Sequence, residues 1–182
     1  QAAKPIWLNP FGTQGLDFHK AAERLRPIVH RTPLQYSPRL SALYNCHVYL
    51  KREDLQVVRS YKIRGAYNMM STLPAEQLRN GVVCASAGNH AQGFAYSCQK
   101  LQIRGVIFMP VITPKQKIKQ TRMFGGDWIE IRLEGDTFDD CAHAAKQYTE
   151  ANQMTFVPPF DHARIIEGQG TVGVEILEDC EG

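Results

Sequence analysis

The sequence predicts an α/β fold in which parallel, twisted strands are joined by crossover helices. Short apolar runs alternate with helix-like stretches of about 10–15 residues, which is the pattern of consecutive β-α-β units. The clearest strand-like runs are Val82-Val83-Cys84-Ala85 and Val106-Ile107-Phe108-Met109. The composition, 43% hydrophobic and 21% charged residues, is that of an ordinary globular domain.

The first quarter of the chain is less regular. Residues 17–26 are expected to form a helix, because their apolar residues recur at helical spacing and Pro27 follows them. Thr32-Pro33-Leu34 is expected to be extended, since a residue before proline avoids the helical region. Residues 47–51 read as a strand.

From residue 61 onward the alternation is clear. Pro114 stands near the start of one expected helix, where proline is tolerated. Asp136 is expected to be the N-cap of another, with Asp139 in its first turn. The expected helices are 61–71, 89–101, 114–123, 136–151 and 171–179, and the expected strands are 82–85, 106–109, 128–131 and 154–157.

The bulk properties exclude several classes of protein. The net charge of +3 and a pI of about 8.6 do not call for a nucleic-acid partner. No apolar run approaches the ~18–20 residues that span a bilayer, so no membrane partner is expected. The N-terminus, Gln1 to Pro5, lacks the features of a signal peptide.

The five cysteines, which lack Cys-x-x-Cys spacing, predict reduced thiols and a cytoplasmic protein rather than disulfides or a zinc site.

Two segments carry the chemistry. In Ser60-Tyr61-Lys62-Ile63-Arg64-Gly65-Ala66 one lysine stands in a turn of small residues, and Ser86-Ala87-Gly88-Asn89-His90-Ala91-Gln92-Gly93 opens a helix after a strand. A lysine amine forms Schiff bases with carbonyl compounds. The free N–H groups at a helix start bind a carboxylate. Together the segments indicate chemistry on an anionic carbonyl compound.

These two segments resemble the lysine and asparagine loops of the fold-type II pyridoxal-phosphate enzymes, whose fold is that of the tryptophan synthase β subunit. Within that superfamily the match is closest to the biosynthetic threonine dehydratases and covers about residues 30–179. The resemblance implies pyridoxal 5'-phosphate as cofactor. It also implies conversion of L-threonine, or of L-serine as a second substrate, into a 2-oxo acid and ammonia.

The resemblance also implies roles for individual residues. Lys62 would hold the cofactor as a Schiff base and then remove the Cα proton, and Tyr61 would pack beside the cofactor where the family more often has phenylalanine. Asn89 would bond the cofactor's 3'-hydroxyl. The substrate carboxylate would be bound by the backbone of the loop: Ser86, Ala87, Gly88, Asn89 and His90.

Ala87 separates two related reactions. The sister family of serine racemases has a serine here, whose hydroxyl donates a proton on the face opposite the lysine. Ala87 has no such proton, so elimination is expected rather than racemisation. A serine dehydratase or racemase relative is the alternative within the superfamily.

Each of these residues also has a simpler interpretation. Lys62 would then be a solvated charge. Arg64 would either be a structural charge or help to keep Lys62 deprotonated. Asn89 would be a helix cap, and His90 would be structural. Gly168-Gln169-Gly170-Thr171-Val172-Gly173 matches a dinucleotide-binding pattern, but no clean strand precedes it. A helix start with close packing explains this motif better, and a nucleotide-binding module is the weaker alternative.

By the same resemblance, residues 1–67 would be part of a large lobe, residues 68–158 a small lobe, and residues 159–182 the start of the return into the large lobe. The family's phosphate-binding glycine loop would come later, so the chain is expected to be a truncated N-terminal portion of a catalytic domain. The full-length form is expected to be a homo-oligomer. A non-catalytic fragment of such an enzyme is therefore a second hypothesis.

Overall fold

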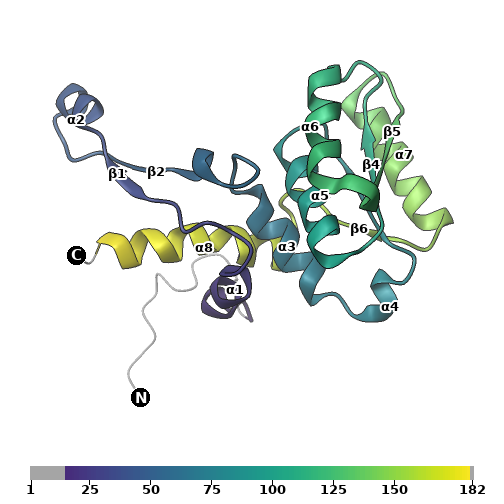
Figure 1. Ribbon diagram of the computed structural model, residues 1–182, viewed down its shortest axis with the longest axis horizontal. Helices are drawn as coiled ribbons and strands as arrows, with labels where there is room; N and C mark the ends of the chain where they lie inside the picture. The colour runs from purple at the N-terminus through teal and green to yellow at the C-terminus, as the bar shows by residue number, and fades with distance from the viewer. Residues whose placement is uncertain (1–14, 181–182) are drawn as a thin grey trace.

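The computed structural model describes residues 15–180, and its body has three layers with a parallel sheet between helices (Figure 1). The strand order is β5-β4-β3-β6 and every neighbouring pair is parallel. This confirms the predicted α/β fold with crossover helices. The strands are β3 (Val82–Ala85), β4 (Gly105–Met109), β5 (Ile129–Leu133) and β6 (Thr155–Phe156).

The two central strands, β3 and β4, are buried on both faces, as expected for parallel strands covered by helices. Alternate residues of the central strands enter two separate clusters. Cys84 and Ile107 pack on the side of α5 (Asn89–Leu101), together with Phe94. Val83 and Phe108 pack on the side of α7 (Phe138–Ala151). In Figure 1, α5 and α6 (Lys115–Gly125) cover one face of the sheet and α7 covers the other.

A second group of elements extends away from this body (Figure 1). An antiparallel pair, β1 (Leu34–Tyr36) and β2 (Tyr49–Lys51), is joined through α2 (Pro38–Tyr44). The 3₁₀ turn η2 (Glu53–Leu55) leads from β2 towards α3 (Lys62–Thr72). Helix α8 (Ala163–Cys180) runs alongside α1 (Phe18–Leu25) and α3, and connects this group to the body.

Most of the predicted elements are present. The strand 82–85 and the helix 89–101 have the predicted bounds, and the other predicted strands and helices up to residue 157 agree with the structure to within a few residues. Helices α2 and α4 (Ala75–Leu78) were not predicted. The sequence does contain a start signal for α2, namely a serine followed by a proline. Ser37 caps the helix by accepting from the Leu40 N–H, and Pro38 is its first residue.

The predicted N-cap of α7 is wrong by one residue. Thr137, not Asp136, is the cap. Its hydroxyl accepts from the Asp140 N–H at 3.1 Å, and the Asp140 carboxylate accepts from the Thr137 N–H at 3.3 Å. This reciprocal pair satisfies two helix-end donors, whereas a cap at Asp136 would satisfy one.

The predicted start of the last helix is also wrong. Helix α8 begins at Ala163, so the glycine motif lies inside it and its N–H groups are used in helical hydrogen bonds rather than turned towards a phosphate. The expected close packing is present: a Cβ on Gly168 would lie 2.4 Å from the Arg64 carbonyl oxygen, and one on Gly170 would lie 2.3 Å from Phe18. These glycines allow α3 and α1 to approach α8, and this packing offsets their poor helix propensity.

The remaining expectations concern membrane-spanning helices, the cysteines and the N-terminus. No helix in residues 15–180 is long and apolar enough to cross a membrane. All five cysteines are free, with Cys84, Cys98 and Cys141 buried and Cys46 and Cys180 exposed. The expectation about Gln1 to Pro5 lies outside the described residues.

Gly168→Ala is expected to destabilise the protein by about 1–3 kcal/mol, because the new methyl group meets backbone that cannot move aside. Gly173→Ala in the same helix is the matched control, since nothing lies within 4 Å of the position that a Cβ would take there and alanine favours the helix by about 0.5–1 kcal/mol. Urea denaturation followed by circular dichroism measures both. Equal stability of the two variants would contradict the close crossing of α3 and α8.

Candidate active site

Lys62 is the first residue of α3, and its side chain points towards the segment that follows β6. Its Nζ donates a hydrogen bond to the Pro159 carbonyl oxygen at 2.9 Å. The Tyr61 ring centroid lies 5.5 Å from Nζ and the Phe160 ring centroid lies 5.8 Å away. The amine is thus partly buried between two aromatic rings.

This burial lowers the pKa of Lys62 below its ordinary value, because the charged form loses solvation. A lower pKa leaves more of the amine neutral and nucleophilic. Arg64 does not contribute to this shift: its guanidinium is buried and bonded to Glu53 and Glu175 at 2.7 and 2.6 Å. Of the two roles open for Arg64, the structure supports the structural charge.

The second segment forms a turn at the start of α5. Gly88 is the N-cap residue, and its N–H donates to the Ser86 hydroxyl at 3.2 Å. Within residues 15–180, no protein group accepts from the N–H groups of Ala87, Asn89, His90 and Ala91. Free N–H groups at a helix start, together with the helix dipole, form a site that favours an anion.

Asn89 is not the cap of α5, so the simpler interpretation of this residue is wrong. It is the first residue of the helix, and α5 has no side-chain cap hydrogen bond. Its side chain is exposed. The carboxamide is therefore available to a ligand.

His90 has a buried side chain with a structural contact. Its Nε2–H donates to the Val157 carbonyl oxygen at 2.9 Å, and this acceptor fixes the proton on Nε2. Nδ1 is buried and has no partner within the described chain. Burial, with a smaller effect of Lys62, lowers the pKa of His90 to about 4, so the ring is neutral at physiological pH.

These groups meet at the carboxyl ends of two neighbouring strands. The chain leaves β3 through residues 86–88 towards α5 and the β4 side of the sheet, and it leaves β6 through residues 157–162 towards α8. The direction of the connections therefore reverses between β3 and β6. In open parallel sheets such a reversal leaves a crevice where ligands bind.

The sequence did not reveal that the carbonyl groups of Val157 and Pro159 bond His90 and Lys62. Every residue carries a carbonyl, so no residue type marks this role. The partial signal was Phe160, an aromatic residue directly after two prolines, whose ring is 68% exposed.

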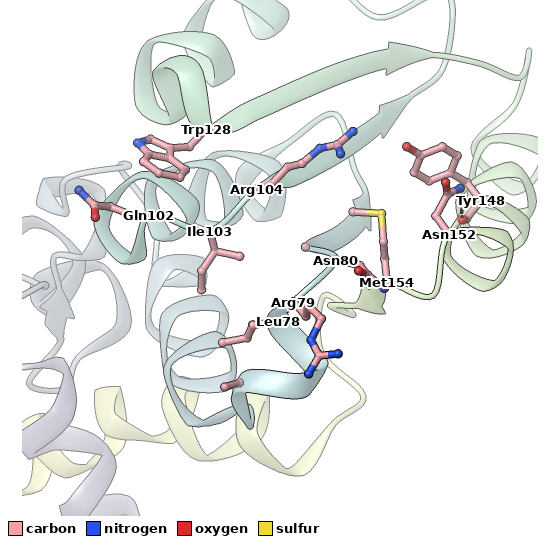
Figure 2. Close-up of a pocket in the computed structure, with 12 residues that line it drawn as sticks. Leu78, Arg79, Asn80, Gln102, Ile103, Arg104, Trp128, Tyr148, Asn152 and Met154 are labelled. Atoms are coloured by element: carbon pink, nitrogen blue, oxygen red, sulfur yellow. Dashed lines mark hydrogen bonds between the residues drawn. The ribbon is translucent and has the colours of Figure 1, made fainter.

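A separate hollow of about 700 Å³ lies at the other end of the sheet, beside the amino ends of β3 and β4 (Figure 2). Figure 2 shows its two arginines, Arg79 and Arg104, pointing in different directions. Arg104 is paired with Glu130 at 3.6 Å. This hollow contains neither Lys62 nor the start of α5.

Comparison with known proteins places this arrangement in a family. Residues 25–182 match the family described as "Pyridoxal-phosphate dependent enzyme". The chain belongs to this family. Its lysine and its α5 start are thus parts of a fold whose members use pyridoxal phosphate.

Named relatives indicate a narrower group. The chain is 57% identical over 161 residues to the biosynthetic L-threonine dehydratase of Halalkalibacterium halodurans, a match that covers 88% of this chain and 39% of the relative. It is 53% identical over 171 residues to that of Mycobacterium tuberculosis (strain H37Rv), covering 94% and 40%. The chain therefore spans about two fifths of the length of the curated relatives it matches.

Solved structures agree with the fold. Processed threonine deaminase isoform 2 from Solanum lycopersicum superposes with a TM-score of 0.81 at 41% identity, covering 88% of this chain and 45% of that one. Maize serine racemase gives a TM-score of 0.84 at 31% identity, covering 90% and 49%. These matches confirm the predicted fold-type II architecture.

The residues present fit the aldehyde end of the cofactor. Lys62 offers an amine with a lowered pKa, and two rings flank it. Asn89 offers an exposed carboxamide at the start of α5, in the loop that leaves the same sheet edge. Pyridoxal phosphate is an aromatic anion that needs such an amine, flat apolar contacts and hydrogen-bond partners.

His90→Gln is expected to flatten the loss of stability in acid. The pKa of His90 is about 4 in the folded protein against 6.5 for the free side chain, so the unfolded chain binds more protons between these values. Stability therefore falls as the pH drops from 6.5 to 4, by up to about 1.4 kcal/mol per pH unit. Glutamine keeps an N–H for Val157 but does not titrate.

Urea unfolding between pH 4 and 7 measures the effect, with the exposed His143→Gln as control. An unchanged pH slope in His90→Gln would contradict the buried, neutral state of this ring.

Proposed function

We propose that this chain carries the lysine and substrate-binding part of a pyridoxal-phosphate-dependent lyase that converts L-threonine into 2-oxobutanoate and ammonia, the first step of isoleucine biosynthesis. L-Serine is proposed as a second substrate. The observation that carries the proposal is the partly buried Lys62 amine at the same sheet edge as the free N–H groups of α5. The 57% identity to a biosynthetic threonine dehydratase supports the choice of substrate.

Lys62 has two tasks in this proposal. Its Nζ would hold the cofactor covalently, and the same Nζ, once free, would take the proton from the substrate Cα. When bound, pyridoxal phosphate supplies an aldehyde and a ring that withdraws electrons from Cα. The lowered pKa of Lys62 suits both tasks, because each needs a neutral amine.

The start of α5 orients the substrate. The free N–H groups of Ala87, Asn89 and His90 bind the amino acid's carboxylate, and the helix dipole favours its charge. Of the residues expected from the sequence, Ser86 and Gly88 have N–H groups that already donate, to the Phe108 carbonyl oxygen and to the Ser86 hydroxyl. The exposed Asn89 carboxamide bonds the cofactor's 3'-hydroxyl, and the Tyr61 ring packs beside the cofactor.

Ala87 selects the reaction. A methyl group cannot deliver a proton to the face of Cα opposite Lys62, so elimination of the β-hydroxyl proceeds without racemisation. This supports a dehydratase rather than a racemase, although maize serine racemase shares the fold at 31% identity.

Further proposals concern the whole protein. Residues 68–158 form a small lobe, and residues 1–67 and 159–182 belong to a large lobe. The full-length enzyme is a cytoplasmic homo-oligomer. A second candidate, that the 182 residues alone bind little cofactor and are not catalytic, is favoured by the coverage of 39% of the threonine dehydratase from H. halodurans.

Lys62→Ala in the full-length protein is expected to abolish the visible absorption of lysine-bound pyridoxal phosphate and to lower turnover by several orders of magnitude, because nucleophile and base are one group. Lys119→Ala, on the exposed face of α6, is the control. Spectra and a lactate-dehydrogenase-coupled assay of 2-oxobutanoate measure both effects. Turnover within tenfold of wild type in Lys62→Ala would refute the assignment, and running the same assay on the 182 residues alone tests the second candidate.

Ala87→Ser is expected to permit measurable racemisation of serine, since it adds a hydroxyl on the proposed proton-donating face. Wild type is expected to return almost only L-serine. Chiral chromatography of recovered serine distinguishes them, with Ala151→Ser at the exposed end of α7 as control. Abundant D-serine from the wild-type protein would overturn the role given to Ala87.

A further inference from the structure

The first turn of α3 depends on a side chain from a distant helix. N–H groups in the first turn of a helix have no partner within it and need one from elsewhere. Lys62 N–H donates to the Ser60 hydroxyl at 3.4 Å, and Arg64 N–H donates to the Tyr61 carbonyl at 3.0 Å. Gly65 N–H donates to Oε1 of Gln169, in α8, at 3.1 Å. Gln169 thus caps the helix that begins with Lys62.

Two glycines make this contact possible. A Cβ on Gly65 would lie 2.8 Å from the Gln169 carboxamide carbon, and a Cβ on Gly168 would lie 2.7 Å from the Gly65 Cα. Helices α3 and α8 therefore cross with their backbones in contact. At this distance the glutamine side chain reaches the end of α3 rather than passing beside it.

The chemistry of the contact argues against simple filling of space. Because Gly65 N–H is a donor, Oε1 must face it and Nε2 must face away. Nε2 is buried and unpartnered within residues 15–180. An unpaired buried donor is unfavourable, so an apolar side chain would suit packing alone better. A carboxamide at this position is explained if its oxygen is needed as the acceptor for the Gly65 N–H.

The capped turn is the one that aims Lys62. Gly65 lies three residues after Lys62, less than one helical turn along α3. Arg64, which lies between them in the sequence, is bonded to α8. Its guanidinium donates to the Thr171 hydroxyl at 3.1 Å and to the Glu175 carboxylate at 2.6 Å. Any tilt of this turn would move Nζ away from the Pro159 carbonyl.

We propose that Gln169 is a positioning residue for Lys62: by capping Gly65 it fixes the first turn of α3 so that the amine points towards the segment that follows β6. This inference rests on the proposed role of Lys62. It also gives a function to the glycine motif, in which Gly168 allows the helix crossing that Gln169 uses.

The test compares Gln169→Met, which keeps the size of the side chain but has no acceptor, with Gln169→Glu, which keeps one. Both are made in the full-length protein, with the exposed Gln147→Met as control. The first readout is the rate at which the visible absorption appears on mixing with pyridoxal phosphate, measured from pH 6 to 10. The second is kcat and KM for L-threonine, and the third is the melting temperature.

Gln169→Met is expected to react at least tenfold more slowly with pyridoxal phosphate, with a displaced pH midpoint, and to lose tenfold or more in kcat with KM within twofold, since small misplacements of a reacting group have large effects. Gln169→Glu is expected to stay within threefold of wild type. A lower melting temperature with unchanged reaction of the folded protein, or equal losses in both variants, would reduce Gln169 to a packing residue and overturn the proposal.

If Gln169→Met does not fold, Gln169→Asn decides instead, because it keeps the carboxamide but is one methylene too short to reach Gly65. Wild-type behaviour of Gln169→Asn would overturn the proposal, and slowed reaction with pyridoxal phosphate would support it. The absorbance readout needs no threonine. A wild-type protein that binds the cofactor but does not turn over threonine therefore refutes the proposed function and leaves this inference standing.

Discussion

The buried guanidinium of Arg64 is the interaction on which the rest of the structure depends. It contacts Glu53, Thr171 and Glu175, and so joins η2 and α8 to α3. Lys51 extends the network by pairing with Glu175 at 2.8 Å. Burial alone would lower the pKa of Arg64, but the two carboxylates raise it above its ordinary value, so the charge is retained. Removing one partner of such a buried network typically costs about 3–5 kcal/mol.

This network connects the extended N-terminal elements to the sheet body through the helix that begins at Lys62. The sheet contributes the other half of the site, since the connections from β3 and β6 diverge at its carboxyl edge. Two bonds join the parts at this edge: His90 to the Val157 carbonyl and Lys62 to the Pro159 carbonyl. The Lys62 amine therefore lies where the N-terminal elements and the sheet body meet. The two motifs at this place come from separate parts of the sequence.

Periodicity predicted the sheet well, because short apolar runs such as β3 alternate with helix-length stretches such as α5. Two motifs likewise singled out two segments that the structure brings to the same edge of the sheet, where Lys62 and His90 bond the segment after β6. The sequence failed where tertiary contacts outweigh local preference. Helix α8 continues through Gly168 and Gly170 because α3 and α1 pack closely against these two positions. Thr137, rather than Asp136, caps α7 because it pairs with Asp140, three residues further on. The roles of Val157 and Pro159 belong to backbone carbonyls, which leave no mark in the sequence.

The hydrogen-bond acceptor of Lys62 affects both the pKa of the amine and the anchoring of the 157–160 segment. A carbonyl oxygen accepts a hydrogen bond from an ammonium and from a neutral amine alike, whereas a carboxylate would stabilise the ammonium and raise the pKa of Lys62. With Pro159 as acceptor, Lys62 can lose its proton and still hold the 157–160 segment in place. The neutral amine donates one N–H and keeps its lone pair, so the anchoring of the loop and the reactivity of the nitrogen do not compete.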